Sequence, residues 1–250
     1  PSGLRPLTPP QASAATIELA RIVMAEPQGF LPKHQNSRFL ACYDNLFCLY
    51  LHWNSLAFMS YEYSENILVQ ESAGDLLQHE LGWRVVFAYN EEKLGENGTF
   101  GRTSYREVLL HRYFREALQK LNPWITPTQI DEAVQKFTAT LSTSSLLQIN
   151  EEKYGFIRDG IPVSYKKPDG ISDVKRALVI DFSNPENNDF LAVKEMKIHG
   201  EIYRRRTDIV GFVNGIPLLF VELKRNDVAV QNAYDDNYTD YLSTIPQLFY

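Results

Sequence analysis

Residues 204–226 read RRRTDIVGFVNGIPLLFVELKRN, and this is the most informative stretch of the chain. Two runs that are almost wholly apolar, DIVGFV and IPLLFVEL, lie on either side of Asn214 and Gly215. An Asn-Gly pair between apolar runs is typical of a β-hairpin. Because strands that lack polar alternation are buried on both faces, we expect these two strands to lie inside a sheet.

Three charged residues occur in this apolar context: Asp208, Glu222 and Lys224. Glu222 and Lys224 are two residues apart, so on a strand their side chains point to one face. Two carboxylates beside a lysine suit metal-assisted phosphodiester hydrolysis, because Mg²⁺ takes oxygen ligands, polarises a phosphate and lowers the pKa of a bound water. Lys224 would then orient that water or neutralise the developing charge. The alternative is a solvated strand face that matches the pattern by chance.

The register of the hairpin tests this hypothesis. A regular hairpin with a two-residue loop would place Asp208 opposite Val221, and so on the other face of the sheet from Glu222. A three-residue loop or one bulge would restore a shared face, for example with residue 212 opposite residue 216 and Gly215 left-handed. We predict the odd loop, and Pro217, which cannot donate to a ladder, also disfavours a regular hairpin.

The spacing of apolar residues predicts the other elements. We expect a helix over 69–81 that stops at Gly82, a strand over 83–89, helices over 105–121 and 126–141, strands within 177–182 and 189–198, and a closing helix that ends before Pro246. Thr126 and Gln129 have the spacing of a capping box. The two middle helices form a helical insertion at about 103–145, and the sheet is assembled late in the chain.

The composition is that of an ordinary globular protein. The chain has 250 residues, 44% of them hydrophobic, and a net charge of -6, so it does not coat nucleic acid by bulk charge. Its two cysteines, Cys42 and Cys48, support neither a zinc module nor a disulfide framework, and a reducing cytoplasm is the expected location. No G-x-x-x-x-G-K-[ST] motif occurs, so we expect no ATP site in this chain.

The N-terminal part differs from the rest of the chain. Residues 1–58 carry seven charged residues, whereas residues 59–250 carry 49. This shift predicts an atypical leader over 1–58 and an independent domain over 59–250, with Met59 as a candidate natural start. Polar residues interrupt the apolar stretch 39–59, so we do not expect a membrane-spanning helix or a membrane partner.

Taken with ALVIDFSNPENNDFLAV, GFIRDGIPV and ESAGDLLQHELGW, the 204–226 stretch resembles the N-terminal nuclease region of the restriction (R, or HsdR) subunit of type I restriction-modification enzymes. The resemblance runs from about Tyr61 to Tyr250. It implies the PD-(D/E)xK fold, an α/β fold with a mixed sheet flanked by helices, and an endonuclease that cleaves double-stranded DNA with Mg²⁺. It implies catalytic roles for Asp208, Glu222 and Lys224, and metal ligation by Asp208, Glu222, the Leu223 carbonyl and Glu71.

The resemblance extends to residues around the acidic pair, with two departures. The family's proline before the first acid is Thr207 here. Its Gln-xxx-Tyr motif, which positions DNA or the active site, falls on Asn237 and Tyr241, where the asparagine amide makes the same hydrogen bonds with a shorter reach. Arg204, Arg205 and Arg206 could contact DNA phosphates, or could form a solvated basic strand end. Glu71 could equally be a solvated helix residue.

In the family, target recognition and methylation belong to separate specificity and modification subunits, and ATP-driven translocation belongs to helicase-like domains that follow the nuclease. The resemblance therefore implies these partners, and ATP as a cofactor of the whole subunit only. It also implies that the chain is truncated before the motor domains. Two other functions stay open: a docking module for the modification and specificity subunits, and a repair nuclease of the same fold.

Overall fold

The computed structural model describes residues 38–43, 46–51, 70–89, 91–139, 145–167, 169–223 and 237–249. Lys224, Met59 and most of the expected leader lie outside these ranges, as does the start of the expected closing helix. In the described parts no helix is long and apolar enough to cross a membrane.

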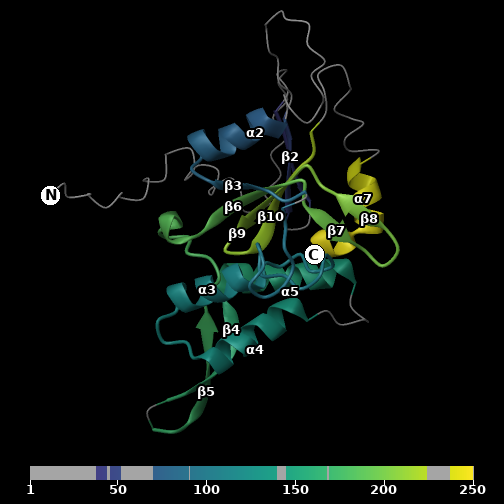
Figure 1. The fold of residues 1–250 in the computed structure, drawn as a ribbon. Helices are drawn as coiled ribbons and strands as arrows, with labels where there is room; N and C mark the ends of the chain where they lie inside the picture. The colour runs from purple at the N-terminus through teal and green to yellow at the C-terminus, as the bar shows by residue number, and fades with distance from the viewer. Residues whose placement is uncertain are drawn as a thin grey trace, which may run out of the picture.

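A mixed six-stranded sheet forms the centre of the molecule (Figure 1). Its strands follow one another in space in the order β1 (Arg38–Tyr43), β2 (Leu46–Leu51), β10 (Ile216–Val221), β9 (Ile209–Val213), β6 (Phe190–Lys194) and β3 (Arg84–Phe87). The β10–β9 and β9–β6 pairs are antiparallel, whereas β3 runs parallel to β6 and β2 parallel to β10. The predicted α/β fold with a mixed sheet is confirmed.

The β9–β10 hairpin corrects the predicted loop. Asn214 and Gly215 form a two-residue turn with φ values of 53° and 81°, and Val213 pairs with Ile216. The prediction of an odd loop is therefore wrong. The two-residue turn forms because the Asn-Gly pair readily adopts the left-handed conformation that such a turn needs. The register shifts instead at a bulge between Pro217 and Leu219. The bulge has the same effect as an odd loop, since it aligns Asp208 with Glu222 one step beyond the last described pair.

The first described helix packs on one face of the sheet. It consists of α2 (Glu71–Asp75) and a π-helical turn, η2 (Leu76–Glu80), and the chain leaves it at Gly82 with φ 71°, close to the predicted end. Trp83 lies so close to Gly211 of β9 that a Cβ there would be 2.7 Å from its ring. Only glycine at 211 permits this approach of tryptophan to the central strand.

The middle of the chain forms a helical layer with its own hairpin, which lies below the sheet in Figure 1. This part contains α3 (His111–Leu121), α4 (Pro127–Thr138), α5 (Leu146–Asp159), β4 (Ile161–Lys166) and β5 (Ser172–Ala177). The capping box of Thr126 and Gln129 is present as predicted. α5 and the β4–β5 hairpin are not predicted from the sequence.

The strand expected over 177–182 is wrong. Only Ala177 lies in a strand, at the end of β5. Beyond it, the Leu178 N–H donates to the side chain of Asn122, and Asp181 accepts from the backbone N–H groups of Ser183 and Asn184. Side chains satisfy this backbone in place of a strand ladder, which explains why an apolar run of strand type forms a loop.

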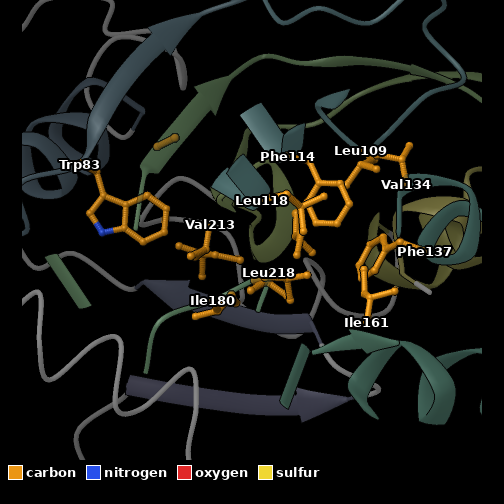
Figure 2. Close-up of a cluster of buried hydrophobic side chains, with 14 of the residues drawn as sticks. Trp83, Leu109, Phe114, Leu118, Val134, Phe137, Ile161, Ile180, Val213 and Leu218 are labelled. Atoms are coloured by element: carbon orange, nitrogen blue, oxygen red, sulfur yellow. The ribbon is translucent and has the colours of Figure 1, made fainter. Parts of the chain in front are cut away.

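Two buried clusters cover the two faces of the hairpin. In one, Phe114, Phe137 and Ile161 from the helical layer pack with Val213 and Leu218 of the hairpin (Figure 2). In the other, Phe220 contacts Tyr241 and Phe249 from the C-terminal part of the described chain. These two clusters hold the hairpin in place, and with it the residues at the ends of its strands.

The C-terminal elements lie beside a small second hairpin (Figure 1). The hairpin consists of β7 (Lys197–His199) and β8 (Arg204–Arg206), and the C-terminal elements are α7 (Thr239–Thr244) and the short 3-10 helix η5 (Pro246–Leu248). Another 3-10 turn, η3 (Pro185–Asn187), precedes β6. The described part of the closing helix ends before Pro246, as predicted.

Candidate active site

Asp208 lies directly before β9, at the end of the sheet where β10 finishes. Its carboxylate is held from two sides: Oδ1 accepts from the Gln70 amide at 2.9 Å, and Oδ2 accepts from the Leu223 backbone N–H at 2.7 Å. Its backbone carbonyl accepts from the Glu195 N–H at 2.8 Å. Three segments that are distant in sequence therefore fix this one residue.

Glu222 follows β10 directly and is buried, with 4% of its surface exposed. The side-chain amide of Asn237 donates a hydrogen bond to its Oε1. Because the Leu223 N–H belongs to the peptide bond that follows Glu222, the 2.7 Å contact to Asp208 places both acidic residues at one end of the hairpin. The structure thus brings together Asp208, Glu222, Leu223 and Asn237.

Tyr241 lies on α7, four residues after Asn237, and packs against Phe220 of β10. Its hydroxyl donates to the Arg206 carbonyl at 3.1 Å, and its ring meets Phe220 edge-on at 5.6 Å. Burial, and then the negative charges of Glu222 and Asp208, raise the pKa of Tyr241 well above its ordinary value. The phenol therefore stays protonated and remains a hydrogen-bond donor throughout the neutral pH range.

Gln70, directly before α2, is a site residue that sequence reasoning missed. It is 5% exposed and reaches Asp208, whereas the adjacent Glu71 is exposed. Glu71 lines a pocket of about 340 Å³ together with Gly74, Asp75, Gln78, Val85, Phe87 and Lys194. Successive helical residues point about 100° apart, so packing decides which one faces Asp208. Metal ligation by Glu71 stays a prediction.

The three arginines of β8 have different surroundings. Arg204 is exposed, whereas Arg205 forms a two-bond ion pair with Asp240 of α7, at 2.7 and 2.9 Å. Arg206 lies 3.3 Å from the buried carboxylate of Glu195. Of the three, Arg205 is the one whose guanidinium is committed to a bidentate partner.

The donor atoms at this end of the sheet suit a hard cation. Asp208 and Glu222 supply carboxylate oxygens, and the backbone at Leu223 can add a carbonyl oxygen, which are the ligands that Mg²⁺ takes together with water. An ionised carboxylate has about four lone-pair sites, so the hydrogen bonds given above leave capacity for a metal. Within the described ranges no three His, Cys, Asp or Glu side chains cluster as a metal site, so a backbone oxygen or water would have to complete the shell.

Comparison with known proteins places this arrangement in a family. Residues 62–250 match the family model described as "Type I restriction enzyme R protein N terminus". The chain is 31% identical over 173 residues to the "Type I restriction enzyme HindI endonuclease subunit" of Haemophilus influenzae, covering 68% of this chain and 16% of that protein. It is 28% identical over 155 residues to the "Putative type I restriction enzyme MjaIXP endonuclease subunit" of Methanocaldococcus jannaschii, covering 59% of this chain and 14% of that protein.

The chain thus spans about a sixth or less of the length of these relatives. The family model covers most of the chain, including β9, β10 and both acidic residues. The chain belongs to the family of type I restriction enzyme R protein N-terminal regions.

Proposed function

We propose that this chain is the Mg²⁺-dependent endonuclease domain of a type I restriction enzyme and that it cleaves double-stranded DNA by phosphodiester hydrolysis. The observation that carries the proposal is the 2.7 Å hydrogen bond from the Leu223 N–H to Asp208, which holds two carboxylates at one end of the hairpin. A hard cation and a phosphate need such a pair of oxygen donors. The names of the two relatives support the same reaction.

In this proposal Asp208, Glu222 and the Leu223 carbonyl hold the metal. A bound Mg²⁺ polarises the phosphate and lowers the pKa of a water, so that a nucleophile is available at neutral pH. Lys224 orients the attacking water, whose oxygen bonds to phosphorus as the P–O bond to the leaving sugar oxygen breaks. Asn237 fixes one oxygen of Glu222, and Gln70 fixes one oxygen of Asp208. Such hydrogen bonds orient ligands for the metal.

We propose that modification and specificity subunits select the DNA, that an ATP-driven motor outside residues 1–250 moves it, and that the enzyme works in the cytoplasm. Arg204 and Arg206 are the β8 residues that we assign to phosphate contact, since charged contacts to the DNA backbone position a protein without reading its sequence.

The test is cleavage of unmethylated DNA by the complete subunit, reconstituted with its modification and specificity partners in Mg²⁺ and ATP. Asp208→Ala and Lys224→Ala should reduce cleavage at least about a hundredfold, because metal-assisted catalysis contributes several kcal/mol. ATP hydrolysis should continue. The control is Glu201→Ala, which removes an exposed acid from the β7–β8 turn and should cut normally.

Normal cleavage by either site variant would overturn the assignment. If both variants cut normally and assembly with the partner subunits still depends on this domain, a docking role replaces the nuclease role. Cleavage of branched or single-stranded DNA by the subunit alone would instead indicate a repair nuclease of the same fold.

A further inference from the structure

The middle arginine of β8 is turned toward α7. Nε and Nη2 of Arg205 lie 2.7 and 2.9 Å from the two carboxylate oxygens of Asp240, and Nε also lies 3.2 Å from the Thr244 hydroxyl. The guanidinium carbon lies over the Tyr203 ring, 5.0 Å from its centroid. Bidentate arginine–carboxylate pairs are stronger and more directional than single charge contacts. Arg205 is therefore engaged on its edge and on one face.

This ion pair and the Thr244 contact join α7 to Arg205 of β8. A further contact is the hydrogen bond from the Tyr241 hydroxyl to the Arg206 carbonyl at 3.1 Å. Consecutive residues of the helix, Asp240 and Tyr241, thus contact consecutive residues of the strand. Two contacts at neighbouring positions restrict both sliding and rotation of the helix against β8.

The same helical segment reaches the candidate metal site. Asn237 lies three residues before Asp240, which is about one helical turn, and its amide donates to Oε1 of Glu222. The orientation of this amide depends on the position of the helix that carries it. Arg205 is therefore linked to a proposed metal ligand by its ion pair with Asp240, by the helical backbone between Asp240 and Asn237, and by the hydrogen bond from Asn237 to Glu222.

We propose that Arg205 and Asp240 are positioning residues for metal binding, which they promote by holding α7 so that Asn237 fixes Glu222. The proposal rests on the nuclease function proposed above. The positioning role applies to Arg205 and not to Arg204 or Arg206, whose side chains point to the other face of β8 because successive strand residues alternate. The competing role for Arg205 is direct contact with DNA phosphates.

The experiment measures metal affinity and DNA affinity separately. Arg205→Gln, Asp240→Asn and the double variant are made in the complete subunit, and Mn²⁺ binding is measured by calorimetry in the absence of DNA. DNA affinity is measured without divalent metal, and the Mg²⁺ dependence of cleavage is recorded with the partner subunits. Arg205→Lys, which keeps the charge but not the bidentate geometry, serves as a milder variant if Arg205→Gln fails to fold.

Two matched controls come from the same chain. Arg204→Gln removes a neighbouring exposed charge that we assign to phosphate contact, so it should weaken metal-free DNA binding and leave metal affinity unchanged. Arg84→Gln breaks another arginine–aspartate ion pair, in which one guanidinium nitrogen contacts both oxygens of Asp189 at 2.7 and 2.9 Å. That pair joins β3 to the start of β6, at the opposite end of the sheet from Asp208. Neither control should change metal affinity.

Arg205→Gln and Asp240→Asn should each weaken Mn²⁺ binding about tenfold, the lower end of the effect of removing groups that orient metal ligands. The double variant should bind Mn²⁺ as well as the single variants do, because each single substitution already removes the same Arg205–Asp240 ion pair. Arg205→Lys should give a smaller loss. Metal-free DNA affinity should match that of wild type.

Unchanged metal affinity in both variants would overturn the inference. So would reduced DNA affinity in Arg205→Gln but not in Asp240→Asn, because a phosphate contact needs only the arginine. Asp208→Ala separates this failure from failure of the proposed function. If Asp208→Ala loses Mn²⁺ binding and the Arg205 variants do not, only the positioning role is wrong; if Asp208→Ala also binds and cuts normally, the metal site itself is wrong.

Discussion

Replacing Asn214 by glycine tests how the hairpin that carries the acidic residues is held in the fold. Asn214 is 1% exposed and has φ 53°. Its amide nitrogen donates to the carbonyl of Val179 and to the side chain of Asn188, both at 2.8 Å, and its oxygen accepts from the Asp189 N–H at 2.8 Å. Glycine tolerates this backbone conformation, so the substitution removes the side-chain hydrogen bonds without adding backbone strain.

The magnitude follows from those three bonds. The buried Val179 carbonyl would lose its side-chain donor, which costs about 1–3 kcal/mol. The other two bonds contribute about 0.5–1.5 kcal/mol each, so Asn214→Gly should lower the free energy of unfolding by about 2–6 kcal/mol. Asn214→Ala should cost at least as much, because a Cβ is disfavoured in the left-handed region by about 1–2 kcal/mol.

Urea denaturation of the chain, followed by tryptophan fluorescence and circular dichroism, measures this loss. The control is Asn184→Gly, at an exposed position of a neighbouring loop, which should cost less than about 1 kcal/mol. A loss in Asn214→Gly that does not exceed the control would refute the reasoning. Because the bulge at Leu218, and not the turn, aligns Asp208 with Glu222, the folded variant should still bind Mn²⁺ with wild-type affinity.

Two further predictions concern buried charge and pH. Arg102 is 0% exposed and its Nη2 lies 2.6 Å from a carboxylate oxygen of Glu92, so Glu92→Gln should lower the free energy of unfolding in urea by about 3–5 kcal/mol. Arg84→Gln, in an exposed ion pair, should lower it by less than about 1 kcal/mol, and equal losses in the two variants would contradict this prediction. Burial lowers the pKa of His111 below its usual 6.5, so the unfolded chain binds more protons there and stability falls as the pH drops through about 6.5. His111→Gln should reduce the difference in unfolding free energy between pH 7.5 and pH 5.5, and an unchanged difference would argue against this role.

Local rules account for the parts of the fold that the sequence predicted correctly. The apolar runs on either side of Asn214 and Gly215 identify two buried strands, because a strand that is covered on both faces cannot hold polar residues at low cost. Thr126 and Gln129 identify a helix start because both partners of the capping box lie within one turn. The acidic pair is recognisable for a similar reason, since charge is costly in such strands.

Tertiary packing selects the way in which Asp208 and Glu222 come to the same face of the hairpin. A three-residue loop and a bulge are equivalent in their effect on Asp208 and Glu222, so alternation along the sequence could not choose between them. The structure has the bulge at Leu218, which packs with Phe114 and Phe137 of the helical layer. Those packing partners come from a part of the chain about a hundred residues earlier.

Long-range contacts also decided the surroundings of the acidic pair. Gln70 lies 138 residues from Asp208 in sequence, and Arg205 lies 35 residues from Asp240. Periodicity gives the face of a helix but not the rotation that turns Gln70 rather than Glu71 toward Asp208. Local patterns in the sequence are therefore enough to predict which residues could form a metal site and on which strands they lie. Packing between distant segments sets which side chains support them, because side-chain hydrogen bonds depend on three-dimensional positions that local sequence patterns do not specify.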